Sequence, residues 1–156
     1  MSPADRLSHF DAGGGARMVD VSHKPVTLRV AEASCRVRLS PRTVLQLAQL
    51  PKGDAYSVAR LAGIQAAKRT AELIPLAHSL PLELVDVDLS PIADGIEIRS
   101  RVVVTAKTGA EMEALVACST AALALYDMVK AVEREAEITD LRLERKSGGR
   151  RGEYRR

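Results

Sequence analysis

Asp94-Gly95 stands between two segments in which apolar and polar residues alternate. Before it come Val85, Val87 and Leu89, and after it come Ile96, Ile98, Val102 and Val104. Asp-Gly favours the tight turn that joins neighbouring antiparallel strands, and strict alternation is typical of strands with one buried face. The chain is therefore expected to contain an antiparallel sheet that needs a covering layer on one side.

A further strand is predicted ahead of this hairpin, over residues 26–39. Its apolar alternation changes phase between residues 31 and 34. Because a shift of one residue turns the apolar face over, the change predicts a β-bulge in this strand. Ser40-Pro41 then fits the N-cap and first position of a short helix that reaches Leu50. A final short strand is predicted over residues 138–143.

Two longer helices are also predicted. One follows an N-cap at Asp54 and ends near Leu73, and the other extends from about Glu111 to Glu135. Gly63 in the first helix marks either a close approach of another backbone or a tolerated glycine that costs about 1 kcal/mol relative to Ala. In the second helix, the apolar period predicts an inner face of Met112, Leu115, Val116, Ser119, Ala122, Leu123, Tyr126 and Val129.

The predicted order of elements is β-α-α-β-β-α-β. We expect an α+β sandwich with helices on one face of an antiparallel sheet, close to the ferredoxin-like layout with one extra helix. A length of 156 residues suits a single domain over 1–156. Within it, residues 1–23 are expected to form a mobile arm, 24–145 the folded core, and 146–156 a basic, glycine-containing tail.

Charge and aromatic content limit the classes of partner. Residues 142–156 hold seven basic and two acidic side chains, so this segment carries +5, while residues 1–141 carry −2 and the whole chain +3. Only 3% of the residues are aromatic and Trp is absent. Because modules that read single-stranded nucleic acids stack bases on aromatic rings, we expect no nucleic-acid partner.

The cysteines and the N-terminus favour a cytoplasmic location. Cys35 and Cys118 are far apart in sequence and form no CxxC pair, so neither a disulfide framework nor a zinc knuckle is expected. The N-terminal segment shows no apolar core of a signal peptide. The longest apolar stretch, residues 114–126, is too short to span a bilayer, so no membrane partner is expected.

Candidate chemistry lies in polar turns and at helix ends. Lys52 beside Gly53 can present its ammonium to a phosphate, although a solvated loop lysine gives the same pattern. His78 can transfer protons near neutral pH or simply pack against its neighbours. His9 and His23 fall in the predicted arm, so no three-histidine metal site is expected. Lys146 precedes a glycine pair that suits either a phosphate-binding loop or a disordered basic tail.

The long helix adds a geometric constraint. Asp127 and Lys130 are three residues apart, which fits an ordinary surface ion pair as well as a reactive one. Glu113 and Asp127 are 14 residues apart, which at 1.5 Å per residue separates them by roughly 21 Å along one helix. If both serve one site, that site must hold a long ligand or be assembled from two subunits.

Several segments are family motifs in order along the chain. They are residues 18–22 (MVDVS), 52–54 (KGD), 59–70 (ARLAGIQAAKRT), 74–78 (IPLAH), 107–115 (KTGAEMEAL), 126–131 (YDMVKA) and 146–149 (KSGG). Together they closely resemble the cyclic pyranopterin monophosphate synthase family, also called molybdenum cofactor biosynthesis protein C. The resemblance covers the chain from about Met18 to Gly149.

This resemblance implies a lyase of molybdenum cofactor biosynthesis. Its substrate would be 3′,8-cyclo-7,8-dihydroguanosine 5′-triphosphate, and its products cyclic pyranopterin monophosphate and pyrophosphate. It also implies a homohexamer built as a trimer of dimers, with sites at subunit interfaces. No tightly bound cofactor is expected, and Mg²⁺ would arrive with the triphosphate.

The resemblance assigns roles to individual residues. Asp127 matches the catalytic acid/base, and Lys130 is expected to keep it ionised and to act as proton donor or phosphate ligand. Lys52 and His78 complete the expected catalytic set. Leu76, Ala77, His78, Met112, Glu113, Glu111 and Lys146 match substrate-contacting positions. We expect Lys52 and Lys146 at the phosphates and the carboxylates at the polar edge of the pterin precursor.

One motif departs from the family pattern. Ala77 and Ser79 flank His78 where relatives usually have Cys and Pro, which argues against a covalent thiol mechanism. Two alternatives to the enzyme follow from the residues. One is a non-catalytic RNA- or nucleotide-binding ferredoxin-like module, which the basic tail would suit, and the other is an inactive assembly relative.

Overall fold

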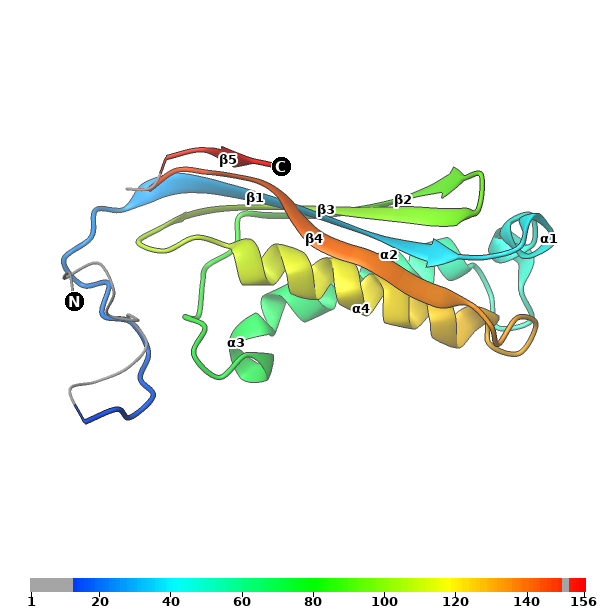
Figure 1. Ribbon diagram of the computed structural model, residues 1–156, viewed down its shortest axis with the longest axis horizontal. Helices are drawn as coiled ribbons and strands as arrows, with labels where there is room; N and C mark the ends of the chain where they lie inside the picture. The colour runs from blue at the N-terminus through cyan, green and yellow to red at the C-terminus, as the bar shows by residue number, and fades with distance from the viewer. Residues whose placement is uncertain (1–12, 150–151) are drawn as a thin grey trace.

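A five-stranded antiparallel sheet forms one layer of the molecule (Figure 1). The computed structural model describes residues 13–149 and 152–156. The strands are β1 (Thr27–Arg38), β2 (Leu84–Ile92), β3 (Gly95–Ala106), β4 (Glu137–Ser147) and β5 (Tyr154–Arg155), in the spatial order β2-β3-β1-β4-β5. The first four strands have the predicted ferredoxin-like order. The predicted hairpin is present, with Ile92 paired to Gly95 across the turn.

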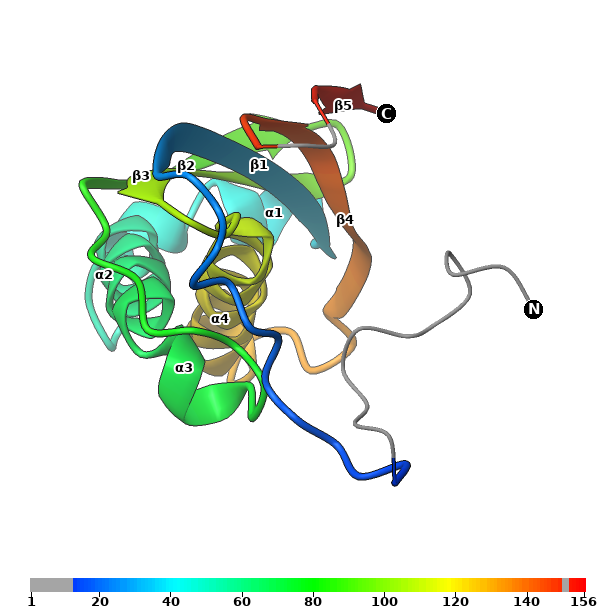
Figure 2. The same ribbon diagram turned by 90° about the vertical axis from the view of Figure 1, so that its left-hand side faces the viewer.

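Helices cover one face of this sheet, as Figure 2 shows in a view along α2 and α4. They are α1 (Pro41–Val44), the 3₁₀ helix η2 (Leu47–Gln49), α2 (Ala55–Lys68), α3 (Thr70–Leu73) and α4 (Glu111–Val129). Ser40 accepts a hydrogen bond from the Thr43 N–H and Asp54 accepts one from the Tyr56 N–H, so both predicted N-caps are confirmed. The expected α+β sandwich is therefore the fold.

The predicted bulge is in a different strand. β1 pairs with β3 without a shift over all its residues, and Ala31, Ala33, Cys35 and Val37 share the core face. The register shifts occur against β4, where Ala33 faces Leu143 while Glu32 faces Arg145. The extra residues thus belong to β4, which bends around the sheet edge, and Asp140 there has a φ of 56°. The apolar residues that start β1, such as Leu28, are exposed.

Some predicted element ends were wrong. The helix predicted to reach Leu73 is interrupted at Arg69, whose N–H donates to the Ala66 carbonyl, and α3 follows. The helix predicted to reach Glu135 ends at Val129, with turns after it. The final strand is 11 residues long and reaches Ser147, because it pairs with β1 on one side and β5 on the other.

α4 buries a face different from the predicted one. Val116, Ala122 and Val129 are buried as expected, but Leu123 is 59% exposed. The residues buried instead are mostly small: Ala114, Ala117, Cys118, Ala121 and Leu125 are each fully buried. Small side chains let α4 lie close to the sheet and to α2. Gly63 of α2 is part of this contact, since a Cβ there would lie 2.8 Å from the Ala117 carbonyl oxygen. The close-approach alternative for Gly63 is therefore confirmed.

Among the described residues, α4 is the one helix long and apolar enough to cross a membrane, with a mean hydropathy of 1.4. The prediction from residues 114–126 therefore underestimated the length of this apolar segment, which extends over Glu111–Val129. More than half of this helix is buried against the sheet and α2. Its apolar side chains serve the core of the domain.

Candidate functional site

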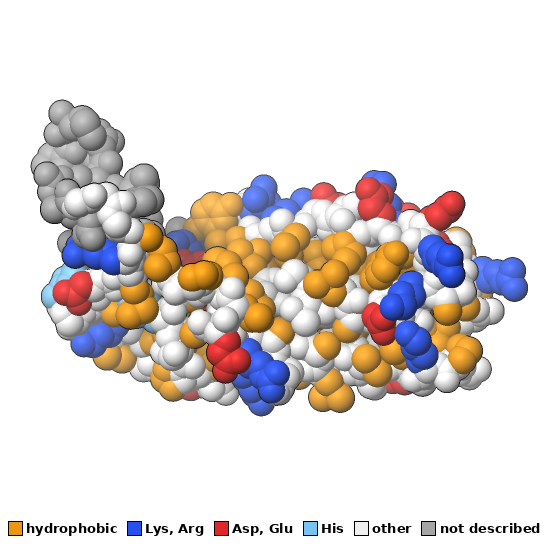
Figure 3. Space-filling model, turned by 90° about the horizontal axis from the view of Figure 1, so that it is seen from below, with side chains coloured by type: hydrophobic (Ala, Val, Ile, Leu, Met, Phe, Trp, Pro, Cys, Tyr) orange, Lys and Arg blue, Asp and Glu red, His pale blue; other side chains and the backbone are white. Residues whose placement is uncertain are grey.

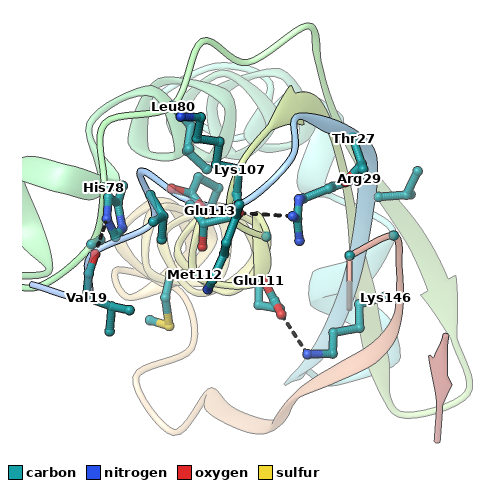
Figure 4. Close-up of a pocket in the computed structure, with 18 of the residues that line it drawn as sticks. Val19, Thr27, Arg29, His78, Leu80, Lys107, Glu111, Met112, Glu113 and Lys146 are labelled. Atoms are coloured by element: carbon teal, nitrogen blue, oxygen red, sulfur yellow. Dashed lines mark hydrogen bonds and ion pairs between the residues drawn. The ribbon is translucent and has the colours of Figure 1, made fainter. Parts of the chain in front are cut away.

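A cavity of about 950 Å³ lies at one end of the sheet, where β1 begins and β3 and β4 end (Figure 4). The start of α4 and the segment between α3 and β2 complete its walls. Seven of the predicted site residues line this cavity: Leu76, Ala77, His78, Glu111, Met112, Glu113 and Lys146. The fold therefore gathers three motifs that are distant in sequence around one space.

Glu113 is the buried acid of this cavity. Its side chain belongs to the first turn of α4 and the residue is only 4% exposed. Burial, which disfavours the charged form, raises the pKa of Glu113 to about 7, and the nearby charge of Glu111 adds to the shift. Both protonation states are thus available near neutral pH, so Glu113 can accept a proton or donate one.

Glu111 and Lys146 form an ion pair across the cavity. Lys146 Nζ lies 2.8 Å from Glu111 Oε1, and both side chains are largely shielded from solvent. Lys146 reaches α4 because β4 continues to Ser147, opposite the start of β1. The pair joins the beginning of the helix to the end of the strand (Figure 4).

His78 faces the N-terminal segment. Its Nε2 lies 2.9 Å from the Val19 carbonyl oxygen, and because a carbonyl can only accept, Nε2 carries the proton that is donated. Lys107 binds the same segment through a 2.8 Å hydrogen bond from Nζ to the Ser22 carbonyl. Residues 19–22 therefore form one wall of the cavity, while residues 1–12 of the predicted arm lie outside the described residues.

Arg29 also lines the cavity, although no motif in the sequence pointed to it. Its Nε and Nη2 groups donate to the carbonyls of Ala106 and Lys107 at 3.0 and 2.9 Å. An arginine in an alternating strand normally faces solvent, so the sequence pattern does not mark it as a cavity residue. The position of Arg29 at the end of the sheet becomes clear only in the structure. The hydroxyl of Thr27, another lining residue, is buried and lacks a hydrogen-bond partner in the described part of the chain.

The other predicted catalytic residues form a second group at the far end of α4. Lys130 Nζ lies 2.6 Å from Asp127 Oδ1, and Lys52 Nζ lies 3.1 Å from Oδ2 and 2.9 Å from the Asp127 carbonyl oxygen. All three side chains are about half exposed. Hydrogen bonds from Lys130 and Lys52 lower the pKa of Asp127, and Asp127 raises the pKa of Lys130. The group holds an ionised carboxylate between two ammonium groups.

The two groups do not meet within one chain. Glu113 lies in the first turn of α4 and Asp127 in its last, and at 1.5 Å per residue the intervening 14 residues correspond to roughly 21 Å. The cavity is lined by neither Lys52 nor Asp127 nor Lys130. The structure thus brings together the predicted substrate-contacting residues and, separately, most of the predicted catalytic ones.

The two carboxylates differ in what they can do chemically. Burial keeps a proton on Glu113 up to about neutral pH, whereas two lysines keep Asp127 ionised. Carboxylates whose pKa values are moved apart in this way suit opposite steps of proton transfer. Among residues 13–149 and 152–156, no three His, Cys, Asp or Glu side chains cluster as a metal site would require.

Comparison with known proteins agrees with the motifs. The chain matches the MoaC family over residues 18–149. It is 54% identical to a cyclic pyranopterin monophosphate synthase of Streptomyces griseus, in an alignment that covers 100% of this chain and 89% of that protein. Enzymes of the same name from Streptomyces coelicolor and Parvibaculum lavamentivorans are 54% and 53% identical. These alignments cover 99% and 97% of this chain, and 92% and 98% of those proteins. The chain belongs to the MoaC family.

Proposed function

We infer that this chain is a cyclic pyranopterin monophosphate synthase, a lyase of molybdenum cofactor biosynthesis. The observation that carries the inference is similarity to enzymes of that name over nearly the full length of both chains. Its substrate is then 3′,8-cyclo-7,8-dihydroguanosine 5′-triphosphate. The enzyme rearranges the purine to a pterin, closes a pyran ring and forms a cyclic phosphate as pyrophosphate leaves.

We assign the pterin precursor to the cavity. Its polar edge offers N–H groups that can donate hydrogen bonds to Glu111 and Glu113, and His78 and Met112 line the same space. With a pKa of about 7, Glu113 can take up and return protons during the ring rearrangement. Lys146 is placed to bind a phosphate once the Glu111 partner turns to the ring.

We assign general acid/base chemistry to Asp127 and Lys130. The ionised carboxylate of Asp127 acts as the base, and the adjacent ammonium of Lys130 donates the proton. Lys52 neutralises phosphate charge as pyrophosphate leaves. Mg²⁺ that arrives bound to the triphosphate is part of the substrate in this scheme.

We propose that a second copy completes the site. One α4 separates the cavity from Asp127 by roughly 21 Å, which is too far for both to serve a single reacting centre. The helical layer also exposes large apolar side chains, among them Leu61 of α2 and Leu123 of α4 (Figure 3). Exposed apolar surface of this kind is typical of protein interfaces. A hexamer formed as a trimer of dimers would cover it and pair the two groups.

The proposed location is the cytoplasm. Cys35 and Cys118 are both free and buried, which suits a reducing compartment. The substrate is a nucleoside triphosphate derivative, and such compounds are made inside the cell.

The direct test supplies the cyclised dihydro-GTP intermediate to purified protein and measures pyrophosphate release together with pterin fluorescence. We expect stoichiometric formation of both products. Asp127→Asn protein of unchanged thermal stability serves as the inactive control.

The alternative functions predict other results. Wild-type protein that is folded and assembled but releases no pyrophosphate would exclude the enzyme and leave the inactive relative. RNA binding that weakens with salt, survives Asp127→Asn and disappears when residues 145–156 are removed would favour the nucleic-acid module.

A further inference from the structure

The guanidinium of Arg29 connects three segments at the end of the sheet. Arg29 belongs to β1 and is paired with Val104 of β3, but its side chain extends past the end of β3. There its Nε and Nη2 groups bind the carbonyls of Ala106 and Lys107. These are the last residue of β3 and the first of the loop that leads into α4 (Figure 4).

This loop sets the position of the buried acid. Only Thr108, Gly109 and Ala110 separate Lys107 from α4, and Glu113 is in the first turn of that helix. The pairing between β1 and β3 ends at Thr27 and Ala106, so Lys107 lies beyond the paired part of the sheet. Its carbonyl binds Arg29 instead of a neighbouring strand. A two-donor fork on adjacent carbonyls fixes both the position and the direction of the loop.

The third group of the guanidinium faces the glycine turn. Gly149 has a φ of +80°, and a Cβ there would collide with Arg29 Nη1. Displacing Nη1 turns the guanidinium plane, which also carries Nε and Nη2, and therefore disturbs the bonds to the two carbonyls. At Gly148, beside it, an added Cβ would likewise collide with the Leu28 carbonyl oxygen of β1. Arg29 is thus enclosed between the loop before α4 and the turn after β4, and both line the cavity.

We propose that Arg29 is a positioning residue that holds the 106–110 loop and the Gly148-Gly149 turn in the geometry that binds the substrate, with Gly149 required to leave room for its guanidinium. The proposal rests on the proposed function, because the cavity is there assigned to the pterin precursor. It predicts that Arg29 and Gly149 act as one unit.

Arg29→Lys is the first test. Lysine keeps the charge and the aliphatic stem, but its single ammonium cannot bind two adjacent carbonyls in a fixed fork. We expect KM for the cyclised intermediate to rise about tenfold, as loss of one charge-assisted hydrogen bond would give, while kcat changes little. Arg36→Lys is the matched control, because Arg36 is an exposed β1 residue paired with Asp140. It should leave KM unchanged.

Gly149→Ala provides the second test, with Gly152→Ala as its control. Gly152 also has a positive φ of +68°, but no atom lies within 4 Å of a Cβ placed there. Both substitutions therefore strain the backbone, and only Gly149→Ala displaces Arg29. We expect KM to rise with Gly149→Ala and not with Gly152→Ala. In an Arg29→Lys background, Gly149→Ala should add no further increase, since lysine has no Nη1 atom.

Hydrogen exchange separates this proposal from the proposed function. If wild-type protein turned over no substrate, the enzyme would be excluded, yet Arg29→Lys should still speed amide exchange over residues 107–113 relative to the 95–100 segment. Unchanged exchange in 107–113, or additive effects of Arg29→Lys and Gly149→Ala on KM, would overturn the positioning role.

Discussion

The surroundings move the pKa values of two carboxylates on the same helix in opposite directions. Glu113 is buried at the start of α4, and this burial raises its pKa to about 7. Asp127 is exposed at the other end, where Lys130 and Lys52 lower its pKa. The same residue class thus provides a proton donor and a stable base, because local dielectric and neighbouring charge differ.

Burial of Glu113 has a consequence for stability against pH. A carboxyl whose pKa is raised in the folded state stabilises the fold below its ordinary pKa of 4.5, and this contribution is lost as pH rises to about 7. Glu113→Gln removes the titration. We expect the variant to gain on the order of 2 kcal/mol relative to wild type between pH 4.5 and 7. Urea unfolding at fixed protein concentration measures this difference, and parallel pH curves would contradict it.

Asp127→Asn tests the base. The amide has the same shape but accepts no proton, so we expect kcat to fall by about 10²- to 10⁴-fold. Asp140→Asn is the matched control, since Asp140 is an exposed carboxylate of β4 that pairs with Arg36 of β1. The assay is pyrophosphate release. Equal kcat values for the two variants would remove Asp127 from the chemistry.

At the scale of single residues, the motifs predicted a group of side chains that the fold brings together. They identified Glu113, His78 and Lys146 as substrate-contacting positions, and all three line one cavity. The local sequence carried no sign of Arg29, because its partners are main-chain carbonyls 77 and 78 residues away. Hydrogen bonds to the backbone leave no pattern of residue types.

Among the elements, α4 and α2 pack unusually closely. Gly63 faces the Ala117 carbonyl, and Ala121 and Val87 lie beside it. Small residues on both helices allow this approach, so α2 and α4 lie side by side on the same face of the sheet (Figure 2). The close packing holds α4 in place, and the cavity and Asp127 lie at opposite ends of this helix.

Gly63→Ala measures that packing. Alanine favours a helix by about 1 kcal/mol over glycine, but its Cβ would lie 2.8 Å from a carbonyl oxygen of the backbone. We expect a net loss of about 1–3 kcal/mol, as overpacked cores show. Gln65→Ala, at an exposed position of the same helix, should change stability by less than about 0.5 kcal/mol. Thermal or urea unfolding gives both values, and a stabilised Gly63→Ala would contradict the close contact.

The sequence predicted where helices and strands form better than it predicted which of their faces are buried. The hairpin at Asp94-Gly95 and the N-caps at Ser40 and Asp54 are encoded by local turn chemistry, and all are present. The buried face of α4 was predicted incorrectly because the helix is apolar nearly all round. The bulges were assigned to β1 and occur in β4, because register depends on which strands become neighbours.

At the scale of the whole molecule, the important distance is the length of α4. It places the predicted substrate-contacting residues at one end and Lys52, Asp127 and Lys130 at the other. The helical layer exposes Leu61 and Leu123, and Figure 3 shows hydrophobic side chains spread over this side of the molecule. A site shared between two copies accounts for both features.

Mixed oligomers test this arrangement. Glu113→Ala and Asp127→Ala subunits should each be inactive alone. When they are unfolded together and reassembled, we expect partial recovery of pyrophosphate release, because some interfaces then combine an intact cavity with an intact Asp127 group. Verified mixed oligomers without activity would contradict a shared site. Mixing two Asp127→Ala preparations gives the control.

The sequence by itself determined the family, the order of the strands and helices, and the residue types of the site. These depend on local turn chemistry, periodicity and motifs that are written along the chain. Only the tertiary structure decided which face of α4 is buried, that Arg29 joins the cavity, and that Glu113 titrates near neutral pH. Burial and backbone hydrogen bonds arise from segments distant in sequence, so no local pattern records them.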